Sequence, residues 1–246
     1  MERDLDLYSQ QYANQAFEPV MVHFRQQKTL TLLGDTTGKH ILEIGCGLAP
    51  CFHWIPDYAS VDIIEPATEF YDYAERLRSE HRHRESIFLH ACTAENYKNI
   101  DNKVFDYIII NSLLHELAEP KQLLQQVRFL CAAHTQVCIN VPNAHSLHRM
   151  LAVHMGLIAS PDTLSEANRK FHQHQVFTAR SLEALVVSAE FRILHTETAF
   201  IKPFTHRQMQ DALDSGLFSA PLLQGLMDIS VALPAYGADI YMMIQV

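Results

Sequence analysis

Residues 40–50 read HILEIGCGLAP, and this stretch decides the fold. An apolar run ends at Ile44 and passes directly into Gly45-Cys46-Gly47, which predicts a buried strand that breaks into a glycine-rich turn. Glycine is needed in such a turn because a Cβ atom would block both positive φ and the close approach of a ligand to the backbone. The stretch therefore predicts a ligand site between a strand and a helix. An ordinary strand-to-helix turn is the alternative, because G-x-G alone is a common pattern.

Strand and helix patterns alternate along the rest of the chain. The predicted strands are residues 40–44, 59–64, 86–90, 104–110, 136–141, 192–199 and 239–246. The predicted helices lie within residues 4–33, 67–79, 120–130, 144–157, 179–189 and much of 202–233, with a short or irregular one at 48–58 because of Pro50 and Pro56. This order predicts the α/β class with a Rossmann-like, doubly wound parallel sheet.

Composition and charge limit the classes of partner that the protein is expected to bind. The formal net charge of −9 gives little attraction for a nucleic-acid backbone, so a small molecule is the expected partner. No stretch is long and apolar enough to span a membrane, and the polar first residues resemble no signal peptide, so we expect a cytoplasmic protein. The five cysteines lack CxxC spacing, which predicts reduced thiols and no zinc ribbon.

Glu65 follows the second predicted strand, eighteen residues beyond Gly47. An acid there is placed to accept hydrogen bonds from the two hydroxyls of a ribose, unless it only caps the next helix. A dinucleotide fingerprint also needs a third glycine, and Pro50 stands at that position. The pattern therefore favours a nucleoside without a pyrophosphate, namely S-adenosylmethionine. A nicotinamide- or flavin-dependent oxidoreductase is the less favoured alternative.

The segments ILEIGCG and SVDIIEP together resemble the first two motifs of class I S-adenosylmethionine-dependent methyltransferases. The resemblance continues through FLHACTAENY, KVFDYIIINSLLHELAEP and QQVRFLCAAHTQVCINVPN, and it extends to small-molecule enzymes of the ubiquinone-biosynthesis O-methyltransferase type. It implies a seven-stranded sheet with the last strand antiparallel. It also implies methyl transfer to a small-molecule acceptor, with oxygen as the expected acceptor atom. A catalytically silent S-adenosylmethionine-binding module is the other alternative.

The resemblance implies one methyltransferase domain over residues 1–246. We expect an N-terminal helical cap (1–33), a cofactor-binding core (34–143), a helical insertion or lid after the fifth strand (144–178), and C-terminal helices and strands (179–246). The implied cofactor-binding residues are Arg25, Glu43, Gly45, Cys46, Gly47, Glu65, Pro66, Thr93, Ala94, Glu95 and Asn111. Of these, Glu43 and the glycine turn would hold the methionine portion of S-adenosylmethionine, Glu65 the ribose, and Arg25 the cofactor carboxylate.

His115 follows the fourth strand and is the candidate catalytic base, because imidazole titrates near neutral pH. The alternative is that His115 only makes a hydrogen bond across the loop. Relatives that bind a metal carry an acid before the histidine, whereas Asn111 precedes it here, so we predict no metal.

The segment after the fifth strand is expected to cover the acceptor. On a helix, His145 and Arg149 share one face and His148 lies beside them, which forms a basic surface suited to a carboxylate or phosphate. The alternative is an ordinary solvent-facing basic helix. The candidate substrate-binding residues are Asn143, His145, His148, Arg149 and His172.

Overall fold

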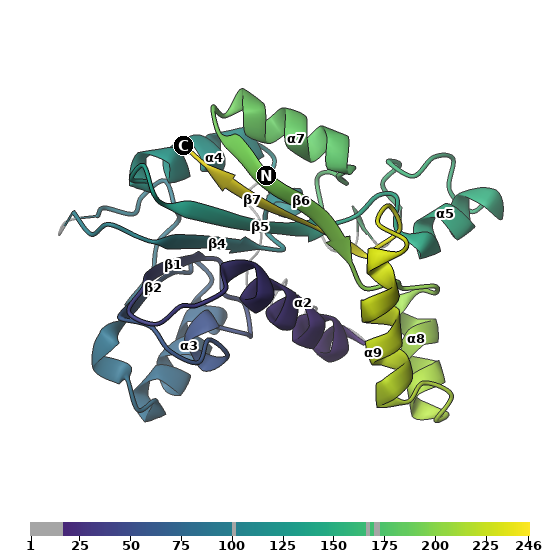
Figure 1. The fold of residues 1–246 in the computed structure, drawn as a ribbon, viewed down its shortest axis with the longest axis horizontal. Helices are drawn as coiled ribbons and strands as arrows, with labels where there is room; N and C mark the ends of the chain where they lie inside the picture. The colour runs from purple at the N-terminus through teal and green to yellow at the C-terminus, as the bar shows by residue number, and fades with distance from the viewer. Residues whose placement is uncertain (1–16, 100–101, 166–167, 170–172) are drawn as a thin grey trace.

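The computed structural model describes residues 17–99, 102–165, 168–169 and 173–246 (Figure 1). Within them, one sheet of seven strands forms the centre of the molecule, in the order β3-β2-β1-β4-β5-β7-β6. The strands are β1 (His40–Ile44), β2 (Ser60–Ile64), β3 (Ile87–His90), β4 (Tyr107–Asn111), β5 (Gln136–Pro142), β6 (Arg192–Ala199) and β7 (Asp239–Gln245). Strand β7 runs antiparallel to both of its neighbours, β5 and β6, and the pairs among β1 to β5 are parallel. The predicted fold class, including the antiparallel last strand, is confirmed.

Helices cover both faces of this sheet, as Figure 1 shows. Helices α4 (Pro120–Leu130) and α7 (Ala179–Ser188) lie on one face, and α2 (Glu18–Leu33) and α3 (Thr68–Glu80) lie on the other. Successive strand side chains point to opposite faces, so each strand contributes to two cores. Ile108 and Ile110 of β4 pack in the core on the α4 and α7 side, whereas Ile109 packs in the core opposite.

A third apolar cluster lies beyond the strand ends. Phe17, Met21 and Phe24, at the start of α2, pack with Phe200, Met209 and residues from the last two helices. These are α8 (His206–Asp214) and α9 (Ala220–Asp228), which Figure 1 shows side by side next to the start of α2. This cluster packs the start of α2 against the region where β6 ends and β7 begins.

The structure differs from the sequence prediction in two connections. The irregular helix expected at 48–58 is reduced to a single 3₁₀ turn, Cys51–His53, because Pro50 and Pro56 bracket it. The helix expected at 144–157 is α5, Leu147–His154. It starts late because the side chain of Asn143 accepts the His145 N–H at 2.9 Å, which closes a turn before the helix. His145 therefore precedes α5, and the predicted helical face shared by His145 and Arg149 is wrong.

Candidate functional site

A cavity of about 840 Å³ lies along the carboxyl ends of the parallel strands. The loops after β3, β2, β1 and β4 line it at one end, and the loops after β5 and β6 and the start of β7 line it at the other. Because β7 is antiparallel, its first residues reach the same edge of the sheet as the last residues of its neighbours. Ligands of open α/β sheets bind at this edge, where the strand order reverses between β1 and β4.

The glycine turn forms the wall of the cavity next to β1. Gly45 and Gly47 have φ angles of 77° and 51°, which only glycine adopts without strain. A Cβ atom on Gly45 would lie 3.4 Å from the Leu113 side chain, so the turn also packs closely against the loop after β4. The predicted need for glycine at these two positions is confirmed.

Glu65 is buried where β2 ends, and it lines the same end of the cavity. Its Oε2 accepts the backbone N–H of Cys46 at 3.0 Å and that of Gly47 at 3.2 Å, while Oε1 accepts the Ala67 N–H at 2.9 Å. Burial raises the pKa of Glu65, and these N–H donors oppose that rise. The Glu65 carboxylate therefore braces the glycine turn.

Glu43 does not line the cavity. Its carboxylate is buried and accepts the Cys51 N–H at 2.8 Å, which holds the 3₁₀ turn after the glycines in place. Burial raises the pKa of Glu43 to about 8, so this carboxyl group is mostly protonated at neutral pH. Glu43 is therefore positioned to stabilise the turn from the side that faces away from the cavity.

The remaining predicted cofactor residues line the cavity: Arg25, Cys46, Pro66, Thr93, Ala94, Glu95 and Asn111. Asn111 ends β4, and its Nδ2 donates to Thr29 Oγ1 at 3.3 Å. Its Oδ1 is buried and accepts no hydrogen bond within the described part of the chain. A buried acceptor without a donor is costly, so this oxygen suits a ligand that brings an N–H or O–H group.

His115 lies in the 3₁₀ turn Leu114–Glu116 that follows β4. Its ring is buried and lines the cavity, with Nε2 3.9 Å from Glu116 Oε1. Its backbone carbonyl accepts the His174 N–H at 3.0 Å, which ties the segment after the insertion to this turn. The structure thus places the candidate base on the cavity wall between its two ends.

Of the predicted substrate-binding residues, Asn143, His148 and Arg149 line the cavity, and His145 does not. Asn143 Nδ2 donates to the carbonyls of Ala235 and Gly237, at 3.0 and 2.8 Å. The Arg149 guanidinium donates to the carbonyls of Pro161 and Thr163 and to Asn168 Oδ1. Arg149 therefore holds the insertion in place. His172 lies outside the described residues.

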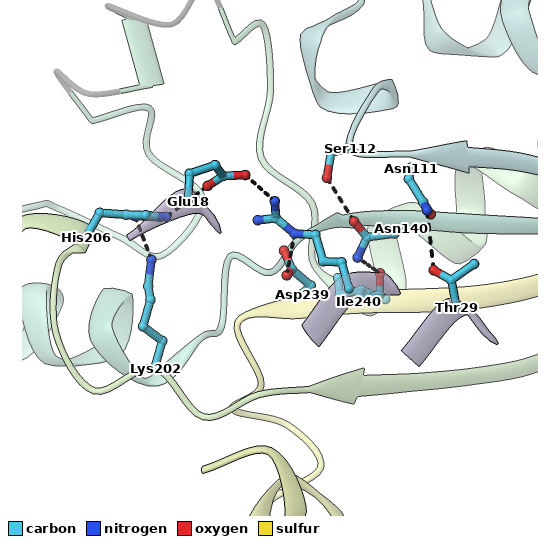
Figure 2. Close-up of polar contacts among 10 residues, drawn as sticks. Glu18, Thr29, Asn111, Ser112, Asn140, Lys202, His206, Asp239 and Ile240 are labelled. Atoms are coloured by element: carbon cyan, nitrogen blue, oxygen red, sulfur yellow. Dashed lines mark hydrogen bonds and ion pairs between the residues drawn. The ribbon is translucent and has the colours of Figure 1, made fainter. Parts of the chain in front are cut away.

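A network of charged and polar side chains, of which the sequence analysis predicted only Arg25, lines the cavity next to β7 and β6 (Figure 2). Arg25 pairs with Glu18 Oε1 at 2.5 Å and with Asp239 Oδ2 at 2.9 Å. His206 Nε2 lies 3.4 Å from Glu18 Oε2, and Lys202 Nζ lies 3.0 Å from His206 Nδ1. Arg25, the predicted partner of a cofactor carboxylate, thus pairs with two carboxylates of the protein itself.

Burial and neighbouring charges shift the pKa values of Glu18 and Lys202 in this network. Burial alone would raise the pKa of Glu18, but Arg25 and His206 outweigh it and hold the value at about 2. Burial lowers the pKa of Lys202 to about 8, although Asp239 and Glu18 favour its charged form. Glu18 is therefore an anion at neutral pH, and Lys202 is a cation that loses its proton in mildly alkaline solution.

A family model described as a methyltransferase domain matches residues 13–196. The chain belongs to this methyltransferase family. The predictions of a class I methyltransferase and of S-adenosylmethionine as its cofactor are confirmed at the level of the family. The described residues fit that cofactor: the glycine turn leaves room for it, Glu65 is an acceptor beside that turn, and Asn111 Oδ1 lacks a donor.

Individual relatives of this family member are distant. The thiol S-methyltransferase TMT1B of Mus musculus is 25% identical over 97 residues, which is 39% of this chain and 40% of that protein. The chain thus matches about two fifths of the length of this curated relative. The plantazolicin methyltransferase BamL, solved with a triazolic desmethylPZN analog and SAH, superposes with a TM-score of 0.61 at 16% identity, covering 98% of this chain and 90% of BamL.

A second solved structure shares this fold but belongs to an enzyme with a different reaction. The [4+2]-cyclase SpnF superposes with a TM-score of 0.59 at 13% identity, covering 89% of this chain and 79% of SpnF. Likeness at this level shows the fold alone, and a cyclase shares it, so the reaction has to be argued from the site.

Residues 17–99, 102–165, 168–169 and 173–246 contain no group of three or more His, Cys, Asp or Glu side chains arranged to hold a metal ion. Nor does any helix among them have the length and apolar character needed to cross a membrane.

Proposed function

We propose that this protein transfers a methyl group from S-adenosylmethionine to a small-molecule acceptor, with oxygen as the acceptor atom. One observation carries the proposal: a single cavity joins the glycine turn, Glu65 and Asn111 at one end to a separate polar end beside β5, β7 and β6. The cofactor and the acceptor would thus bind at adjoining sites in one cavity. The matches to methyltransferases support this assignment, whereas they offer no support for the nicotinamide or flavin alternative.

At the cofactor end, Glu65 would accept hydrogen bonds from the ribose hydroxyls, and Asn111 Oδ1 would accept one from the methionine ammonium. Thr93, Ala94 and Glu95, after β3, would contact the adenine. S-adenosylmethionine supplies an already activated methyl group, so the protein mainly contributes proximity and orientation.

At the acceptor end, the nucleophile has to lie in line with the methyl group and lose its proton. His115 lies on the cavity wall between the two ends, where an imidazole can take that proton. Arg149 and Asn143 shape this end through their hydrogen bonds to backbone carbonyls. Electrostatic contacts with buried side chains of the cavity wall are stronger than contacts made in bulk water.

Sulfur is the second candidate acceptor atom, since the curated relative TMT1B is a thiol S-methyltransferase. The same base would serve a thiol, whose proton is easier to remove than that of an alcohol. The two candidates therefore differ in the acceptor alone.

Methyl transfer can be tested with S-adenosylmethionine labelled in its methyl group and with matched panels of small phenols, hydroxy acids and thiols. We expect wild-type protein to label at least one oxygen compound, and the Glu65→Ala variant to lose the activity. Labelling of thiols alone would assign sulfur as the acceptor atom. Cofactor binding without labelling of any acceptor would favour the catalytically silent alternative.

A further inference from the structure

Lys202 is a buried cation at the end of the cavity farthest along the sheet from the glycine turn. It follows β6, its side chain lines the cavity, and the residue is only 3% exposed. Its backbone carbonyl accepts the His148 N–H at 3.2 Å, so the segments after β6 and β5 meet here. Both residues therefore present their side chains to the same end of the cavity.

The carboxylates nearest to Lys202 are engaged elsewhere. Glu18 and Asp239 both pair with Arg25. Within the described part of the chain, the Lys202 ammonium has one hydrogen-bond partner, His206 Nδ1, and lies within ion-pair distance of no carboxylate. An ammonium has three donors. Lys202 therefore has unused donors and no carboxylate in direct contact, although Asp239 and Glu18 favour its charged form.

His148 adds a second polar group that lacks a partner. It is at the start of α5, lines the cavity, and has a buried Nδ1 without a hydrogen-bond partner among the described residues. Burial lowers the pKa of His148 well below its usual range, and the nearby Lys202, His206 and Arg149 lower it further. The ring is thus neutral at pH 7 and has a nitrogen free for a ligand.

We propose that Lys202, His148 and His206 form an oxyanion subsite that holds a carboxylate or phosphate group of the methyl acceptor. An oxyanion here would accept from the unused Lys202 donors and from a ring N–H of His148. This assignment rests on the proposed function and adds the class of acceptor: an acidic small molecule rather than a neutral one.

The groups facing Lys202 predict how anion binding depends on pH. They are His148 and Arg149 from α5, His206 from α8, Glu18 and Arg25 from α2, and Asp239 from β7. The charged ammonium binds the anion, and burial places its pKa at about 8, so affinity should fall as the pH rises above that value. Arginine keeps its charge throughout this range, and the Lys202→Arg variant should lose this pH dependence.

The test uses wild-type protein saturated with S-adenosylhomocysteine and titrated with sodium acetate or inorganic phosphate at constant ionic strength. The ring-proton NMR signal of His148 reports binding. This signal is identified as the one that is missing from the spectrum of the His148→Asn variant. We expect a saturable shift, weakened roughly 10- to 100-fold in Lys202→Met, as expected for loss of a charged hydrogen bond. The control is Arg207→Met, which removes an exposed cation of α8 that pairs only with Asp211 among the described residues, and it should bind as wild type does.

Tighter binding of acetate would assign a carboxylate acceptor, and tighter binding of phosphate would assign a phosphorylated one. The proposal is overturned if neither anion gives a saturable shift, or if Lys202→Met binds them as tightly as wild type. Affinity for S-adenosylhomocysteine is measured on every variant, both to show that each is folded and to separate the two claims. Failure of wild type to bind it would contradict the proposed function instead.

Discussion

At the scale of single residues, local motifs and distant partners differ in how well the sequence predicts them. Gly45, Gly47 and Glu65 were predictable because one turn and the end of the next strand carry the whole pattern. The pairing of Arg25 with Asp239 was not, since these residues are 214 positions apart and meet only once the sheet has formed. Lys202 escaped notice because a lone lysine after a strand resembles a solvated one.

The ion pairs of Glu18 predict a pH-dependent contribution to stability. Its pKa is about 2 in the folded chain against an ordinary 4.5, so its contribution is complete above pH 4.5 and is lost as the pH falls toward 2. Glu18→Gln should lower the free energy of unfolding by on the order of 3 kcal/mol at pH 7 and by much less near pH 3. Urea denaturation at the two pH values measures this difference.

Glu75→Gln is the matched control, because Glu75 pairs with Arg78 on the surface of α3 with its side chain 39% exposed. Exposed pairs contribute little, so this change should cost less than about 1 kcal/mol at either pH. An effect of Glu18→Gln that is equal at both pH values would show that the ion pairs are not its cause.

His115 can be tested as a base by separating binding from turnover. His115→Ala should leave the affinity for S-adenosylhomocysteine unchanged and lower methyl transfer roughly 10²-fold or more, the usual effect of removing a general base. The control is His154→Ala, at the exposed end of α5. Calorimetry and the labelled-methyl assay give the two quantities, and unaltered turnover would assign His115 a structural role.

At the scale of elements, the sequence predicted all seven strands, because all but the mostly polar β6 are short apolar runs between turn residues. The start of α5 was misplaced because the Asn143 side chain closes a turn that competes with the helix, and helical periodicity does not reveal such a bond. The predicted helices of residues 202–233 are present as α8 and α9. Their packing against the start of α2 depends on long-range contacts that periodicity does not encode.

The junction of β6 and β7 makes a prediction about Gly237. A Cβ atom there would lie 2.5 Å from Thr198 Oγ1 and 2.6 Å from the Ala199 backbone nitrogen, so part of the junction would have to move. Gly237→Ala should therefore lower the free energy of unfolding by about 1 to 3 kcal/mol, the usual cost of overpacking. Thermal and urea denaturation measure the change.

Gly225 provides the matched control for this substitution. It lies within α9, and a Cβ atom there would have no neighbour within 4 Å. Gly225→Ala should stabilise the protein by about 0.5 to 1 kcal/mol, since alanine is the better helix former. Similar effects of the two alanine substitutions would refute the argument from close packing.

At the scale of the whole molecule, sheet topology explains why one cavity has two chemically different ends. The loops after β1, β2 and β3 bring glycine and carboxylate to one end, and the segments after β5 and β6 bring the cations Arg149 and Lys202 to the other, beside Asp239 of β7. The end beside the glycine turn was predictable because it repeats a family pattern. The end beside β6 and β7 was not, because its residues come from separate elements that differ in direction and in sequence position.

The central claim is that the end of the cavity beside β1 and β2 binds S-adenosylmethionine through Glu65. The most direct measurement is isothermal titration of S-adenosylhomocysteine into wild type, Glu65→Ala, and Glu80→Ala as an exposed control at the end of α3. The claim predicts one bound molecule per wild-type chain and per control chain. In Glu65→Ala, binding should be weaker by on the order of 1.5 to 3 kcal/mol, because the lost acceptor is charged. A folded wild-type protein that binds no S-adenosylhomocysteine, or a folded Glu65→Ala variant with unchanged affinity, would contradict it.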